Sequence, residues 1–128
     1  MEVHAPMIGI DLVEPNRLRD RLSRTRGLDV ELFTSGELAY CRAQPAPQEH
    51  LAARFCAKEA TAKALGLDGF DPLEVEVIDG GPAARLALHG DAQDRAELLG
   101  VVVSVSLTHV SGMAAAVVLA LPSRAERS

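Results

Sequence analysis

A run of 17 residues, His50 to Gly66, constrains the fold of this chain more than any other segment. It reads H-L-A-A-R-F-C-A-K-E-A-T-A-K-A-L-G, so alanine dominates and no proline interrupts it. Alanine has the highest helix propensity, and glycine often ends a helix in the left-handed conformation. We therefore expect one long helix over residues 50–66, preceded by a loop over residues 43–49 that contains two prolines.

The apolar residues of this helix fall into two stripes when they are placed at about 100° per residue. One stripe carries larger side chains, and the other carries only small ones, against which another backbone could pack closely. The pattern predicts a helix buried on two sides, with its charged residues between them. The stripes comprise Leu51, Phe55, Ala62 and Leu65, and Ala53, Ala57, Ala60 and Ala64.

Glu59 and Lys63 lie one turn apart on this helix and allow two interpretations. The first is an ordinary helical ion pair, worth only ~0.2–0.5 kcal/mol. The second is a helix edge that holds a metal ion and phosphates, which requires another carboxylate from elsewhere in the chain. Glu59 has apolar neighbours in Phe55 and Ala52, and an unpaired buried charge is costly, so its carboxylate needs a partner.

Length and composition limit the possible functions. At 128 residues we expect one domain over residues 1–121 and a polar tail over 122–128. A net charge of -5 argues against a general nucleic-acid-binding protein. Only 3% of the residues are aromatic, and a core that light often gains from oligomerisation. Cys41 and Cys56 have no CxxC spacing, no segment could span a membrane, and no export signal is visible, so we expect a cytoplasmic protein with free thiols.

The rest of the chain alternates strand and helix patterns, which predicts an α+β or α/β fold. Thr34 and Glu37 match a capping box, and Asp91 is a suitable N-cap. Residues 101–108 and 113–121 are expected to form an antiparallel pair. The expected strands cover residues 7–13, 73–78, 84–88, 101–108 and 113–121, and the further helices cover residues 17–26, 35–42 and 92–99.

Two features outside the long helix have both structural and functional interpretations. Asp11 interrupts an apolar strand, where it either caps or turns the chain or presents a carboxylate at a site. Arg17, Arg21 and Arg24 fall on one face of the first helix. Such a face is usually only solvated, but within an acidic protein it could dock an acidic partner.

Three separated segments carry a family resemblance: G-I-D-L-V-E at 9–14, A-A-R-F-C-A-K-E-A at 52–60 and V-S-V-S-L-T-H at 103–109. In order and spacing they resemble the small holo-acyl-carrier-protein synthase type of 4′-phosphopantetheinyl transferase. The resemblance extends from Ile8 to about Leu121. It implies the fold of that family: a small antiparallel sheet packed against a long central helix, in a subunit of a homotrimer with active sites at subunit interfaces.

The resemblance also implies an activity. Members transfer the 4′-phosphopantetheine arm of coenzyme A to a serine of apo acyl carrier protein, use Mg²⁺ and release adenosine 3′,5′-bisphosphate. By position, Asp11 and Glu59 match the metal ligands and Lys63 a third catalytic residue. Lys63 and Lys58 match lysines near the coenzyme A phosphates, and Arg54 and His109 match the coenzyme-binding wall. Arg17, with Arg21 and Arg24, matches the basic helix that meets the acidic carrier protein.

Two alternatives remain open at this level. One is a catalytically silent homologue that binds coenzyme A or a carrier protein. The other is a different metal-assisted phosphoryl or pyrophosphate enzyme on the same scaffold. The general base is also open between a metal-bound water and one of the two carboxylates, Asp11 and Glu59.

Overall fold

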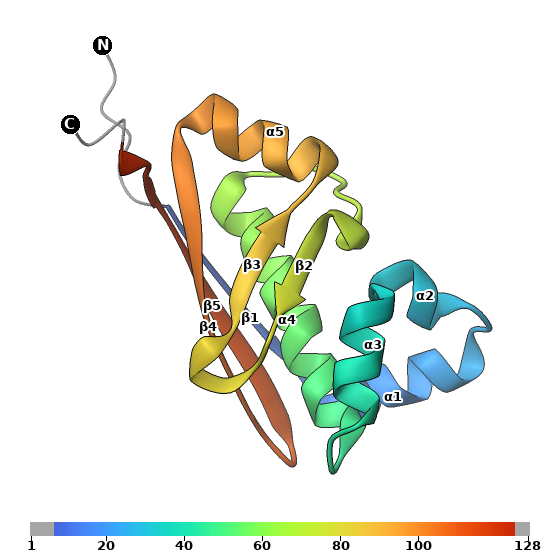
Figure 1. The fold of residues 1–128 in the computed structure, drawn as a ribbon. Helices are drawn as coiled ribbons and strands as arrows, with labels where there is room; N and C mark the ends of the chain where they lie inside the picture. Colours follow the sequence, from blue (N-terminus) through green and yellow to red (C-terminus); the bar gives the residue numbers. More distant parts are fainter. Residues whose placement is uncertain (1–6, 125–128) are drawn as a thin grey trace.

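The structure, a computed structural model, describes residues 7–124 and shows an α+β fold (Figure 1). The long helix α4 lies at its centre, between a three-stranded sheet and a smaller two-stranded sheet. The elements in chain order are β1 (Met7–Val13), α1 (Pro15–Arg24), α2 (Leu28–Leu32), α3 (Ser35–Arg42), α4 (Pro47–Leu65), the 3₁₀ turn η1 (Pro72–Glu74), β2 (Val75–Ile78), the 3₁₀ turn η2 (Gly81–Ala83), β3 (Arg85–Leu88), α5 (Gly90–Leu99), β4 (Val101–Val110) and β5 (Met113–Pro122).

The larger sheet is antiparallel, in the order β1-β5-β4. Asp11 pairs with Ala116 of β5, which in turn pairs with Leu107 of β4. Successive side chains of a strand point to opposite faces, so Gly9 and Asp11 face α4. The alternate residues Ile8, Ile10 and Leu12 face outward. The predicted first strand and the predicted antiparallel pair of final strands are confirmed.

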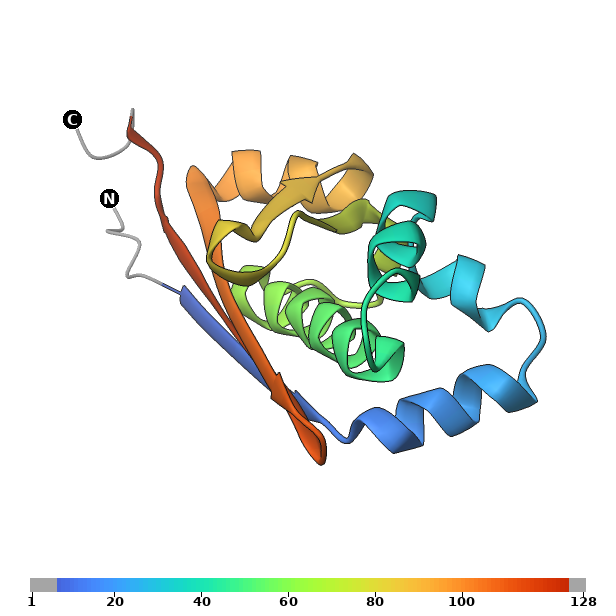
Figure 2. The ribbon, with the colours of Figure 1, turned by 60° about the horizontal axis from the view of Figure 1, so that its bottom comes forward.

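Helix α4 packs against all three strands of this sheet on one side and against β2 and α3 on another (Figures 1 and 2). Alanines with less than about a tenth of their surface exposed line both sides, because only small side chains let the helix axis approach a neighbouring backbone. Gly66 caps its C-terminus in the left-handed conformation. The predicted burial on two sides is therefore confirmed.

Several predicted boundaries shift by a few residues. Helix α4 begins at Pro47 rather than His50, because proline fits the first helical position and lacks only an N–H that needs no helical partner there. Pro15 starts α1 for the same reason, and that helix ends at Arg24. The predicted strand over 73–78 is a 3₁₀ turn followed by the shorter strand β2.

The start of α5 corrects the prediction that Asp91 caps it. The N-cap residue is His89, and the backbone N–H of Ala92 donates to Oε1 of Glu74 at 3.3 Å. A carboxylate from a distant segment therefore supplies the acceptor expected from Asp91. The short helix α2 was not predicted, since five residues are too few to show a helical period.

The capping box of α3 is confirmed in both directions. The backbone N–H of Glu37 donates to Oγ1 of Thr34 at 3.2 Å, and the backbone N–H of Thr34 donates to Oε1 of Glu37 at 2.9 Å. Within residues 7–124, no helix is long and apolar enough to cross a membrane. The predicted tail over 122–128 stays a prediction, because residues 125–128 lie outside the described part of the chain.

Candidate active site

Asp11 of β1 and two residues of α4, Glu59 and Lys63, form a charged group where the strand lies on the helix. The Nζ atom of Lys63 lies 3.2 Å from Oδ1 of Asp11 and donates to the carbonyl of Ile10 at 2.9 Å. Lys63 therefore reaches across to the strand, and Asp11 is its ion-pair partner. The ion pair of Lys63 is therefore with Asp11 of β1 and not with Glu59, as the first interpretation from the sequence expected.

The surroundings of this group are strongly negative. Burial raises the pKa of Glu59, the nearby charge of Asp11 raises it further, and Lys63 opposes the rise only in part. Burial, followed by the charges of Asp11 and Glu59, raises the pKa of the neighbouring Cys56 thiol to about 12. Burial is the larger cause of both shifts, and the negative charge of Asp11 adds to it, so a further cation beside Asp11 and Glu59 would be stabilised by both carboxylates.

The donor set fits a hard divalent cation. Carboxylate oxygens suit Mg²⁺, which usually takes one or two of them and completes its shell with waters and substrate phosphates. Among the described residues, no three His, Cys, Asp or Glu side chains gather into a cluster that could hold a metal ion. Asp11 and Glu59 supply two carboxylates, the number that an Mg²⁺ ion of this kind takes from a protein.

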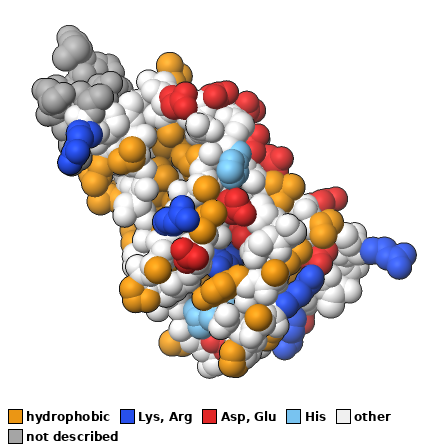
Figure 3. Space-filling view, in the orientation of Figure 1, with side chains coloured by type: hydrophobic (Ala, Val, Ile, Leu, Met, Phe, Trp, Pro, Cys, Tyr) orange, Lys and Arg blue, Asp and Glu red, His pale blue; other side chains and the backbone are white. Residues whose placement is uncertain are grey.

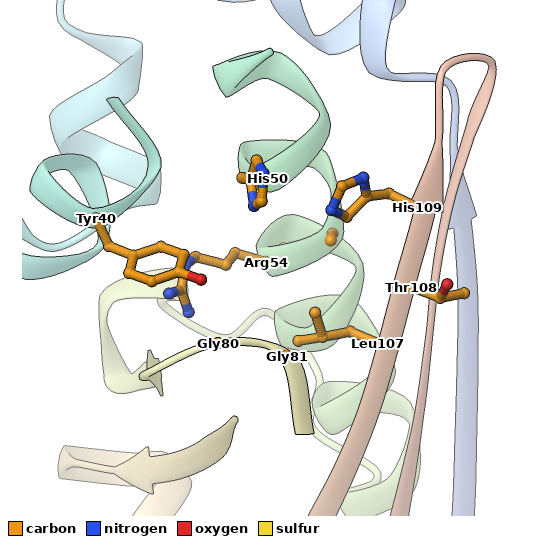
Figure 4. A pocket seen from close by; sticks show the side chains of 9 residues that line it. Tyr40, His50, Arg54, Gly80, Gly81, Leu107, Thr108 and His109 are labelled. Carbon is orange, nitrogen blue, oxygen red and sulfur yellow. The ribbon is translucent and has the colours of Figure 1, made fainter. Parts of the chain in front are cut away.

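A second feature is a pocket of about 290 Å³ beside the N-terminal half of α4 (Figure 4). Side chains from α3, α4 and β4 enclose it together with the backbone of the turn before β3. Its lining is cationic and aromatic and includes two of the predicted site residues, Arg54 and His109. The remaining lining residues are Tyr40, His50, Ala53, Gly80, Gly81, Leu107 and Thr108.

Arg54 is almost fully buried and shapes one wall of this pocket. Its guanidinium group donates to the carbonyls of Val77 and Asp79 at 3.0 and 2.6 Å, and its Cζ atom lies 4.3 Å from the ring centroid of Tyr40. The Nε atom is buried and has no protein partner among the described residues. Arg54 therefore anchors the turn that follows β2 and leaves one donor unsatisfied.

His109 lines the pocket from the end of β4. Its Nδ1 atom lies 2.9 Å from Oε1 of Glu49, and its ring is 4.5 Å from that of His50, edge to face. His50 also meets the ring of Tyr40, with the centroids 6.1 Å apart. The sequence did not predict roles for Tyr40, Glu49 and His50. The only available signal was that Glu49 and His50 stand at the start of the predicted helix, as the last loop residue and the first helical residue.

Lys58 does not lie where its predicted contact with coenzyme A phosphates requires. Its side chain is fully buried, and its ammonium group lies 2.8 Å from Oε1 of Glu37. It also donates to the carbonyls of Pro72 and Val75 at 2.8 and 2.6 Å. Three acceptors occupy its three N–H donors, so Lys58 joins α4 to α3 and β2 and has no donor left for a ligand.

Arg17, Arg21 and Arg24 are exposed on α1, as their spacing predicts. Arg17 and Arg21 border a cavity of about 310 Å³ with an apolar lining that includes Phe55. Figure 3 shows acidic side chains gathered over α5 and basic ones over the segment from α1 to α3. The chain therefore has a basic end despite its net negative charge.

Comparisons with known proteins agree with this arrangement. The profile of the 4′-phosphopantetheinyl transferase superfamily matches residues 7–118. A holo-[acyl-carrier-protein] synthase of Moorella thermoacetica is 42% identical over 123 residues, which cover 92% of this chain and 95% of the relative. The corresponding protein of Streptomyces avermitilis is 45% identical over 117 residues, which cover 88% of this chain and 94% of the relative.

Solved structures give the same result. An ACPS–CoA complex from Chronobacterium ammoniagenes has a TM-score of 0.82 at 27% identity, and the match covers 94% of this chain and all of that one (100%). A Bacillus anthracis holo-(acyl-carrier-protein) synthase in complex with CoA (3′,5′-ADP) has a TM-score of 0.74 at 27% identity, covering 91% of this chain and 96% of that one.

The fold and the residue pattern thus define a transferase of the phosphopantetheinyl class. The chain belongs to the 4′-phosphopantetheinyl transferase superfamily, and its relatives place it among the holo-[acyl-carrier-protein] synthases. This result confirms the resemblance carried by the three sequence segments and the prediction that the chain is an enzyme. It also favours the synthase over the alternative of a different phosphoryl-transfer enzyme.

Proposed function

We propose that Asp11 and Glu59 hold the Mg²⁺ ion with which this chain transfers the 4′-phosphopantetheine arm of coenzyme A to a serine of apo acyl carrier protein, releasing adenosine 3′,5′-bisphosphate. One observation carries the proposal: β1 brings Asp11 to the part of α4 that carries Glu59 and Lys63, where Nζ of Lys63 lies 3.2 Å from Oδ1 of Asp11. The charge of Asp11 also adds to burial in raising the pKa of Glu59. Such a pair is stabilised by a divalent cation.

When bound, Mg²⁺ would supply charge neutralisation on the pyrophosphate oxygens of coenzyme A. Lys63 adds a positive charge beside them, and Asp11 and the carbonyl of Ile10 hold its ammonium group in place. The attacking hydroxyl belongs to the carrier protein, so this chain needs no nucleophile of its own. Cys56 cannot supply one, because its thiol is buried and stays protonated at neutral pH.

The pocket beside Arg54 and His109 is proposed to hold part of coenzyme A. Two features support this assignment: the guanidinium group of Arg54 in the pocket lining and the aromatic wall made by Tyr40 and His50. Anionic groups pair with such donors, and bases stack on such rings. Lys58 is not included, since its contacts with Glu37 and backbone carbonyls leave it a structural role.

The basic face of α1 is proposed to dock the carrier protein. Arg17, Arg21 and Arg24 are exposed. Arg17 forms an ion pair with Glu14 at 3.5 Å, and both side chains of this pair are more than half exposed. An exposed pair of this kind is weak and readily exchanged for an acidic partner. Positive charges on one surface also accelerate encounter with a negatively charged protein.

A homotrimer is the proposed assembly. One face of the larger sheet points away from α4, and on it the exposed fractions of Ile8, Ile10 and Leu12 are 63, 60 and 61%. A contiguous apolar face of this kind is rarely left in solvent. Within one chain, Arg54 extends toward β2 and Lys63 toward β1, on different sides of α4. One coenzyme molecule that contacts an Arg54 and a Lys63 would therefore take these two residues from neighbouring copies of the chain.

Intact-mass spectrometry of apo acyl carrier protein, incubated with this chain, coenzyme A and Mg²⁺, tests the proposal. We expect a mass gain of one phosphopantetheine arm, which is lost with EDTA and with Glu59→Gln or Asp11→Asn. Glu97→Gln, a change on the exposed face of α5, is the matched control and should leave transfer unchanged. Full transfer by the Glu59 and Asp11 variants would contradict the assignment of the two carboxylates.

A further inference from the structure

Glu49 and His109 form a pair that none of the roles above requires. Glu49 belongs to the first turn of α4 and His109 to the end of β4, 60 positions further along the chain, and Oε1 lies 2.9 Å from Nδ1. Both side chains are mostly buried, with exposed fractions of 18 and 26%. A contact of this length between shielded groups is more strongly held than the exposed ion pairs of α1.

The chemistry of the pair determines which ring nitrogen faces outward. A carboxylate can only accept a hydrogen bond, so Nδ1 of His109 must carry a proton toward Glu49 in either protonation state of the ring. The partner at one nitrogen sets the tautomer and orientation of the whole imidazole. Nε2 therefore remains available to the pocket.

His50 limits the remaining freedom of the His109 ring. The two rings meet edge to face at 4.5 Å, and His50 in turn packs against Tyr40 (Figure 4). Burial lowers the pKa of His50, and the neighbouring His109 and Arg54 lower it further, so His50 stays neutral at physiological pH. It acts as a stacking surface and adds no second positive charge beside Arg54.

We propose that Glu49 is a positioning residue for coenzyme A: by accepting from Nδ1 it holds the ring of His109 so that, with both ring nitrogens protonated in the complex, Nε2–H donates to a phosphate of the coenzyme in the pocket that Arg54 also lines. This inference rests on the proposed function, since it assumes that coenzyme A occupies this pocket. Glu49 itself touches no substrate and acts only through His109. Its loss should therefore weaken coenzyme binding and leave the transfer step intact.

Steady-state kinetics of Glu49→Ala tests the proposal. We expect KM for coenzyme A to rise about tenfold, the effect of one charge-assisted hydrogen bond, with kcat at saturating coenzyme within about twofold of the parent. Glu49→Asp should recover part of the loss, because it keeps the acceptor. The matched control Glu31→Ala, an exposed residue of α2, should change neither parameter.

A double-mutant cycle separates positioning from simple support of the fold. In a His109→Ala background, Glu49→Ala should raise KM no further, because the ring on which it acts is gone. The ¹⁵N shifts of the His109 ring should show a proton on Nδ1 in the parent and its loss from that atom in Glu49→Ala. Equal effects of Glu49→Ala with and without His109, or unchanged ring shifts, would overturn the inference.

The same experiments distinguish failure of the positioning role from failure of the proposed function, and a second variant covers the case in which Glu49→Ala does not fold. If Glu49→Ala does not fold, Glu49→Gln, which keeps the shape and an acceptor, replaces it in the same cycle and is held to the same criteria with a smaller expected rise in KM. If the parent transfers phosphopantetheine but KM is insensitive to Glu49, only the positioning role fails. If the parent transfers nothing to any apo carrier, the proposed function fails instead, and the ring shifts still report whether Glu49 holds His109.

Discussion

Gly9 of β1 lies directly against the backbone carbonyl of Ala60 in α4. A Cβ atom at position 9 would overlap with that carbonyl oxygen and come within 2.9 Å of the backbone nitrogen of Ala64. Strand and helix therefore meet backbone to backbone, with only hydrogen and methyl groups between them. Asp11 lies two residues further along the same face of the strand, so this close approach is what brings its carboxylate to Glu59 and Lys63.

Gly9→Ala is expected to lower both stability and activity. The added methyl group has no room unless β1 moves, and overpacking of this kind costs about 1–3 kcal/mol in the free energy of unfolding. The same movement would separate Asp11 from Glu59 and slow transfer. Urea denaturation and the mass-gain assay measure the two effects, and Gly112→Ala, where nothing lies within 4 Å of the added atom, is the control.

Lys58→Met should destabilise the protein by about 3–5 kcal/mol, because it leaves the buried carboxylate of Glu37 without its partner. Lys63→Met is the contrasting variant. Lys63 is 56% exposed, so its loss should cost less than about 1 kcal/mol while transfer activity falls. Urea denaturation at one protein concentration measures both. If Lys58→Met is as stable as the parent but binds coenzyme A more weakly, the result would contradict the structural role and support the phosphate contact predicted from the sequence.

The carboxylate of Glu76 should contribute to the acid dependence of stability. Burial alone would raise its pKa, but hydrogen bonds with Thr34 and His89 outweigh burial and hold the pKa below its ordinary value of 4.5. A lowered native pKa means that the stabilisation is fully present above about pH 4.5 and is lost as the pH falls through the native value.

Glu76→Gln should therefore lower the free energy of unfolding at pH 7 by up to about 1 kcal/mol and make its fall below pH 4.5 shallower. Urea denaturation of the parent and the variant at several pH values from about 3 to 7, a range that includes the ordinary glutamate pKa, measures this difference in the free energy of unfolding. Glu31→Gln, an exposed change on α2, is the control. Parallel stability profiles for Glu76→Gln and the parent would contradict this role.

The two cysteines should be unreactive in the folded protein. Cys41 and Cys56 have no exposed surface, burial raises the pKa of both, and for Cys56 the value is about 12. Titration with a thiol reagent at pH 8 should detect neither thiol in the native state and both in urea. Stability should also fall above pH 9, where the thiols ionise in the unfolded chain before they do in the native one.

Local patterns predicted much of the fold. The capping box of Thr34 and Glu37, the helix-ending Gly66 and the alternating strand β4 were all recognised, because each depends on contacts within a few residues of sequence. The N-cap of α5 was predicted wrongly because a distant group took over a local task. Glu74 supplies the acceptor at the start of α5, and no pattern around Asp91 could show that.

From the sequence by itself, only the family resemblance predicted that Asp11, Glu59 and Lys63 belong to one site, whereas composition alone predicted the long alanine-rich helix, which the structure confirms. The tertiary structure decided what the two lysines of that helix do. Lys58 and Lys63 are five residues apart and equally cationic in the sequence. Because β2 and α3 cover one side of α4, Lys58 is buried against Glu37, whereas Lys63 emerges beside β1, where its exposed ammonium group reaches Asp11.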